Sequence, residues 1–186
     1  RITNSSGDEL QGTTSISFAQ GIAYFTDLAL MTYGDRYIEF TSSVFVAQQS
    51  FSVSIGPPAK IVVTTQPTDS FADEAFPTSI VVAVQDRGSN TVLDVFDVHA
   101  SLRGNRQSSP LLGVTSRQTM NGVASFEQLK VAAVGTGFTI RFEATRLSQT
   151  LSVISDQFSL RGKLGGIIAT QFPSGGIAFE MLEPPV

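Results

Sequence analysis

Few side chains in this sequence could perform acid–base or nucleophilic chemistry. His99 is the single histidine, two residues from Asp97 on a strand-like stretch. It has no second histidine with which to share a metal and no evident serine partner. A general base needs its partner within hydrogen-bond reach, so the pattern favours a solvated histidine on a polar strand face.

The remaining motifs point away from catalysis. Acidic residues such as Asp69, Asp86 and Asp94 are scattered singly through turns, which favours solvated side chains and does not match a dedicated calcium loop. Neither Gly135–Gly137 nor Gly162–Gly165 has the order of a phosphate-binding loop, and no Gly-x-Ser-x-Gly elbow occurs. The chain has no cysteine. We therefore expect no enzyme, no metal site and no cofactor.

One modification signal is present near the start of the chain. Asn4-Ser5-Ser6 fits the acceptor pattern for N-linked glycosylation. Covalent glycans would also solvate a chain in which only 15% of residues are charged. Asn4 is accordingly the candidate glycosylation site.

Charge and hydropathy exclude two classes of partner. The chain of 186 residues has a formal net charge of -4, so no basic face is expected that could neutralise phosphates. No stretch approaches the roughly 18 apolar residues of a membrane helix. We expect neither nucleic-acid binding nor membrane insertion.

The apolar residues that would position any site alternate with a period of two. Residues 61–65, 79–85, 123–129 and 138–144 are strand-like, with a turn expected at Val134–Gly137 and a last strand near Val153–Leu160. From Thr91 onward, Phe96, Val98, Ala100 and Leu102 share one face. We predict an all-β chain without helices, organised as antiparallel β-sandwiches.

An internal repeat sets the domain organisation. The sequence Gly21-Ile-Ala-Tyr-Phe25 recurs as Gly122-Val-Ala-Ser-Phe126, and Gly12 and Gly34 recur as Gly113 and Gly135, always 101 residues later. Gly56 with Ile61-Val-Val-Thr64 then pairs with Gly162 and Ile167-Ile-Ala-Thr170. The matches predict the C-terminal half of one domain in residues 1–56, a complete domain in residues 57–162, and the opening strands of a following repeat in residues 163–186.

These features together resemble the tandem immunoglobulin-like repeats of large surface proteins, such as bacterial invasin-like and intimin-like arrays and similar algal or protist arrays. The likeness rests on the Gly-x-Ala-x-Phe-x-x-Leu box, Phe-Ser-Val/Leu before a Gly linker, and Ile/Val-Val-x-Thr-x-x-Pro opening the next unit. The resemblance implies immunoglobulin-like β-sandwiches at the cell surface or outside the cell, acting as stalks, spacers or adhesive tips. It implies no catalytic residue.

Residues 1–56 and 163–186 look complementary. A half sandwich would expose an apolar face and a sheet edge, which invites pairing with another strand. We expect an acceptor face made of Phe18, Phe25, Leu28, Phe40 and Phe51. The expected donor segment carries Ile167, Ile168, Phe172, Ile177, Phe179 and Met181. Neither fragment holds an equivalent of Val82–Ser101, so a joined domain would be a reduced sandwich.

The sequence therefore predicts a structural subunit of an extracellular filament. Copies of the chain would join head to tail, each donating its C-terminal segment to the incomplete domain of a neighbour. The alternative is an adhesin or stalk module, taken from a longer array, in which loops such as Arg103–Gln107 bind a receptor or a glycan. In that case the ends carry no mechanism.

Overall fold

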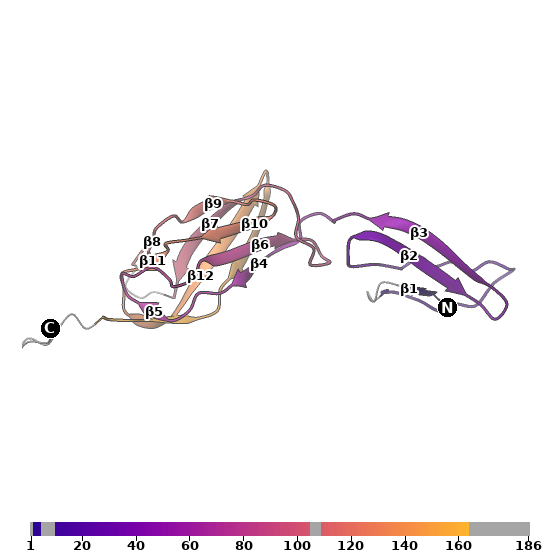
Figure 1. Cartoon of the computed structure of the whole chain (residues 1–186), viewed down its shortest axis with the longest axis horizontal. Helices are drawn as coiled ribbons and strands as arrows, with labels where there is room; N and C mark the ends of the chain where they lie inside the picture. Colours follow the sequence, from indigo (N-terminus) through magenta and orange to yellow (C-terminus); the bar gives the residue numbers. More distant parts are fainter. Residues whose placement is uncertain (1, 5–9, 105–108, 164–186) are drawn as a thin grey trace, which may run out of the picture.

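The computed structural model describes residues 2–4, 10–104 and 109–163. Within these residues the chain is all-β, as predicted, and contains no helix. We call residues 2–4 and 10–56 the N-terminal segment, and the described residues from 57 to 163 the central unit. The two lie end to end along the long axis of the molecule (Figure 1).

The N-terminal segment contains one antiparallel sheet of three strands. Its strands are β1 (Ile2–Asn4), β2 (Gly34–Thr41) and β3 (Val46–Val53), in the order β1-β2-β3. Phe40 on β2 lies opposite Ile2 on one side and Ala47 on the other. Residues 10–33 run beside this sheet with only isolated bridges, such as Gln11 to Ala29.

The central unit is built from two main sheets and one small one. The first sheet has the order β10-β6-β4, and the second has the order β5-β14-β12-β7-β9 with β13 also paired to β12. All these pairs are antiparallel except β5 with β14. Strands β8 and β11 form the small sheet. The strands are β4 (Lys60–Thr65), β5 (Ser70–Phe71), β6 (Ile80–Gln85), β7 (Asp97–Arg103), β8 (Leu111–Leu112), β9 (Ser116–Gln118), β10 (Val123–Phe126), β11 (Lys130–Val131), β12 (Gly135–Arg146), β13 (Gln149–Ile154) and β14 (Phe158–Arg161).

Side chains from both main sheets make up one hydrophobic core. Alternate residues point inward, so that Val98 and Ala100 on β7 are buried while Asp97 and His99 are exposed, as the sequence predicted. Five phenylalanines of this core make tilted or edge-on ring contacts: Phe126 with Phe142, and Phe158 with Phe76 and Phe138. Every buried apolar side chain among the described residues belongs to the central unit.

Two sequence-based predictions about strand ends were wrong. Of the turn expected at residues 134–137, Gly135–Gly137 are instead the start of β12, with a register shift between Gly135 and Phe138. The expected last strand is two strands, β13 and β14, separated at Ser155. The Ser155 hydroxyl accepts a hydrogen bond from the Ile140 N–H at 2.9 Å and donates to the Asp156 carbonyl.

The internal repeat is reproduced in the backbone. Gln11 pairs with Ala29 as Leu112 pairs with Lys130, and the bridge from Ala19 to Ile22 recurs from Met120 to Val123. Gly12 and Gly113 have φ of 99° and 100°, a left-handed conformation that favours glycine. Residues 101 positions apart therefore occupy equivalent places in the two parts of the chain.

Candidate functional site

The N-terminal segment leaves its apolar residues accessible. Among residues 10–56 no side chain is buried, and Phe18 is 55% exposed. Phe40, the equivalent of the fully buried Phe142, is only half-buried. An exposed apolar cluster of this kind marks a surface that another element can cover.

Several exposed and half-buried residues of the N-terminal segment line a groove of about 250 Å³. Phe25 packs against Phe40 with ring centroids 6.1 Å apart, and Phe18 contacts Phe45 edge-on at 6.4 Å. The lining residues come from the 16–25 stretch, from the end of β2, from the connection between β2 and β3, and from the start of β3: Ile16, Phe18, Ala23, Phe25, Phe40, Thr41, Ser42, Phe45 and Ala47. We call this set the apolar groove.

The central unit shows what covers the equivalent surface there. Ala124 and Phe126, the equivalents of Ala23 and Phe25, lie on β10, which pairs with β6 through Val82 and Ile80. Strand β4 then pairs with β6 and completes that sheet. In the N-terminal segment residues 23–26 belong to no strand. The apolar groove is thus the equivalent of the core that β6 and β4 close in the central unit.

Three of the five predicted acceptor residues come together in this groove. Phe18, Phe25 and Phe40 line it, whereas Leu28 and Phe51 are half-buried elsewhere, Phe51 beside Arg36 and Tyr37 in a separate depression. Ile16 and Phe45 were not among the predicted residues. The alternation of Ile16 and Phe18 about Ser17 was a usable signal, because it places both on one side of an extended chain.

The other predicted site residues lie away from the apolar groove or outside the described residues. The donor residues Ile167, Ile168, Phe172, Ile177, Phe179 and Met181 lie outside the described residues, as does part of the loop Arg103–Gln107. Asn4 lies in β1 with its backbone opposite Ile38. Its glycosylation stays a prediction.

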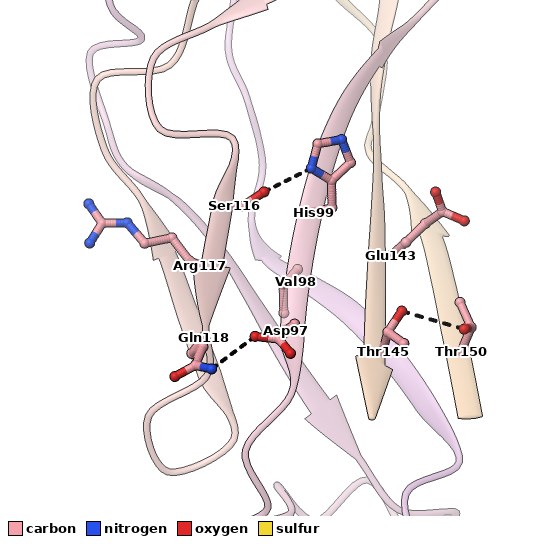
Figure 2. Close-up of a pocket in the computed structure, with 9 residues that line it drawn as sticks. All are labelled: Asp97, Val98, His99, Ser116, Arg117, Gln118, Glu143, Thr145 and Thr150. Carbon is pink, nitrogen blue, oxygen red and sulfur yellow. Dashed lines mark hydrogen bonds between the residues drawn. The ribbon is translucent and has the colours of Figure 1, made fainter. Parts of the chain in front are cut away.

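A second candidate surface is the polar face of β9, β7, β12 and β13 (Figure 2). His99 lies there, and the expectation that it has no serine partner was wrong, because its Nδ1 lies 3.0 Å from Ser116 Oγ on β9. The serine is 17 positions away in sequence, and only the pairing of β7 with β9 brings the two together.

The neighbouring carboxylates on this face have other partners. Glu143 lies opposite His99 on β12, but its carboxylate contacts Arg141 at 2.9 Å. Asp97 accepts a hydrogen bond from Gln118, and Thr145 bonds Thr150 across β12 and β13 (Figure 2). A nucleophilic serine needs a base that a third group orients, and these carboxylates are directed elsewhere. The face presents both hydrogen-bond donors and acceptors to solvent.

The turn carboxylates are engaged in structural contacts. Asp73 and Lys130 form an exposed ion pair at 2.8 Å, and Asp69 accepts the Ser159 N–H at 2.7 Å. Asp86, expected as a solvated turn residue, is buried at 4% exposure. In the described ranges, no three histidine, aspartate or glutamate side chains cluster as a metal site would require.

Searches for relatives add no family to this description. No protein-family model and no curated protein sequence matches the chain. Within the part of the chain that the structure describes, no helix has the length and apolar character needed to cross a membrane.

Proposed function

We propose that this chain is a structural subunit of an extracellular filament made of immunoglobulin-like β-sandwiches. Copies of the chain are the partners, and residues 163–186 of one copy add strands to the N-terminal segment of the next. Covalent glycans, with Asn4 as the candidate site, would solvate the surface. The role is mechanical and needs no catalytic residue and no cofactor.

The observation that carries this proposal is the apolar groove beside an unpaired stretch of backbone. In the central unit the equivalent backbone, Ala124–Phe126, pairs with β6, and the equivalent rings are covered. An extended segment that pairs with residues 23–25 would insert alternate side chains into the groove. This is strand addition to an unpaired stretch of backbone.

The sequence of residues 163–186 suits this role. Ile167-Ile-Ala-Thr170 resembles Ile61-Val-Val-Thr64 of β4, the strand that covers the core of the central unit. Ile177, Phe179 and Met181 alternate with Ala178 and Glu180. Burial of the six donor side chains would contribute on the order of 10 kcal/mol before the cost of ordering the segment.

Negative-stain electron microscopy tests the proposal directly. The full chain should form fibres, and a chain ending at Gly162 should not. Phe179→Asp should abolish the fibres because it places a charge in the groove, whereas the matched control Ala178→Asp, on the opposite face of the alternation, should keep them.

The acceptor side has its own matched pair. Phe18 lines the groove, whereas Tyr24, at 69% exposure, is not among the lining residues. Phe18→Asp should block assembly and Tyr24→Asp should not. Monodisperse particles from the full chain and from the shortened one would instead favour the adhesin or stalk module, in which preceding residues of a longer array cover the groove.

A further inference from the structure

Among the described residues, the hydrogen bonds between the N-terminal segment and the central unit are made by one turn, Asp86–Asn90, which follows β6. The Asp86 N–H donates to the Asn90 carbonyl, and the Ser89 N–H donates to the Asp86 carbonyl. The Asn90 side-chain amide donates to both carboxylate oxygens of Asp86, at 3.1 and 2.9 Å. Hydrogen bonds within the turn therefore stabilise its conformation independently of its contacts with the N-terminal segment.

This turn bonds the N-terminal segment at two points. The Asn90 side-chain amide also donates to the Met31 carbonyl at 2.7 Å, 59 positions away in sequence. The Gly56 N–H donates to Asp86 Oδ2 at 2.9 Å. Asp86 is almost completely buried, so each donor to its carboxylate offsets part of the cost of burying the charge.

Gly88 allows the close approach. A Cβ at this position would overlap the Met31 carbonyl oxygen, although the φ of Gly88 is one that other residues adopt. The requirement for glycine thus comes mainly from the Met31 carbonyl of the neighbouring segment, although the added Cβ would also crowd the Asn90 side-chain amide within the turn. Such a requirement is typical of a surface shaped for one particular partner.

The linker is restrained as well. Residues 54–59 connect β3 to β4 and contain Pro57 and Pro58, whose rings fix φ. The Gln149 side-chain amide donates to the Pro58 carbonyl at 3.0 Å, and the Ala59 N–H donates to the Gln85 carbonyl at 2.8 Å. The prolines fix two φ torsions of the linker, and these hydrogen bonds hold its last two residues against the central unit.

We infer that the turn Asp86–Asn90 is a docking surface for a preceding unit of the same repeat, and that it holds the two in one fixed orientation. The partner it fits is the end of a unit that presents a carbonyl oxygen and a backbone N–H in the positions of Met31 and Gly56. The inference is independent of filament assembly, because all its contacts lie within one chain.

Spin-label distance measurements on the full chain test this inference. The chain lacks cysteine, so cysteines introduced at Val44 and Leu147 carry the only labels; these side chains are 86% and 89% exposed and lie in different parts. Labelled chain is diluted into excess unlabelled chain, so that distances between copies do not contribute. One narrow distance peak is expected.

The variants separate docking from folding. Gly88→Ala places a Cβ where the Met31 carbonyl lies, and Asn90→Ala removes the amide that donates to this carbonyl. Both variants should replace the narrow distance peak by a broad distribution. Gln118→Ala is the matched control, because it removes an amide that also bonds an aspartate, but within the central unit. Its peak should stay narrow.

Either of two results would overturn the inference. One is a broad distribution in the unsubstituted chain, and the other is a narrow, unshifted peak in Gly88→Ala. Urea unfolding of the central unit is measured in parallel. An unchanged urea midpoint in Gly88→Ala, together with a broadened distance peak, would mean that the substitution disrupts the contact with Met31 and Gly56 without destabilising the central unit.

Discussion

Phe25 and Phe40 lie with ring centroids 6.1 Å apart and planes at 56°, almost the arrangement of Phe126 and Phe142, at 5.2 Å and 52°. The first pair is half-buried, and both rings of the second pair are fully buried. The same aromatic contact therefore exists in both parts of the chain. A sheet covers it in the central unit, and none of the described residues covers it in the N-terminal segment.

Truncating each pair should have different consequences for the isolated chain. Phe126→Ala leaves a cavity in a packed core and should destabilise the central unit by about 3–5 kcal/mol. Phe25→Ala removes a ring that still contacts solvent and should cost clearly less. Urea unfolding of each variant measures the difference, and an equal loss for both would mean that the groove is already covered in the isolated chain.

Glycine at position 113 should be required for both its conformation and its surroundings. Its φ is 100°, and a Cβ would overlap the Gln128 carbonyl oxygen. Gly113→Ala should therefore cost more than the roughly 1 kcal/mol expected for left-handed strain alone. Gly137→Ala is the control, because φ there is 75° but nothing lies within 4 Å of the added Cβ. Unfolding midpoints should rank Gly113→Ala below Gly137→Ala, and the reverse order would contradict the structure.

The contact of the turn Asp86–Asn90 with Met31 and Gly56 should weaken in acid. Burial by itself raises the pKa of Asp86, but hydrogen bonds from the Asn90 amide and from backbone N–H groups, that of Gly56 among them, outweigh it and hold the pKa below its ordinary value of 3.8. A lowered pKa stabilises the folded state at every pH above the ordinary pKa of the group. This stabilisation is lost as the pH falls from the ordinary pKa through the pKa of the folded state.

The spin-label distance distribution measured against pH checks this expectation. The narrow peak should broaden only below about pH 4, once Asp86 begins to bind a proton. Asp86→Asn lacks the titrating group, so its distribution should not change over the same range. Equal acid broadening in parent and variant would assign the effect to other carboxylates.

Much of the fold was predictable because it depends on local pattern. The period-two alternation around Val98 and Ala100 correctly placed the buried face of β7. The recurrence of Gly12 and Gly21 at Gly113 and Gly122 predicted equivalent backbone, because glycine at a left-handed position marks a specific turn.

What the pattern missed depends on contacts between distant residues. The break between β13 and β14 lies at Ser155, whose hydroxyl accepts a hydrogen bond from the N–H of Ile140 on a neighbouring strand. The pairing of His99 with Ser116 depends on the register of β7 against β9. A serine or a histidine in a strand-like sequence gives no sign of such partners.

The candidate site was only partly predictable for the same reason. Phe25 and Phe40 lie in repeated motifs, and Phe18 was expected from the exposed apolar face of a half sandwich, whereas Phe51, the equivalent of the buried Phe158, lies away from the groove. The burial of Asp86 was missed because its donor Gly56 lies 30 positions away. A charged residue in a Gly-Ser-Asn turn otherwise predicts a solvated side chain.

The contact between Met31, Gly56 and the turn after β6 has a geometric consequence. The repeat places Ala132 and Gly162 where Met31 and Gly56 stand. A row of units joined each time by this contact would relate every unit to the next by one rotation and one translation. Repeating such an operation generates a screw, which stays open unless the rotation closes a ring. The pitch and hand of any array of these units would then be set by the turn Asp86–Asn90.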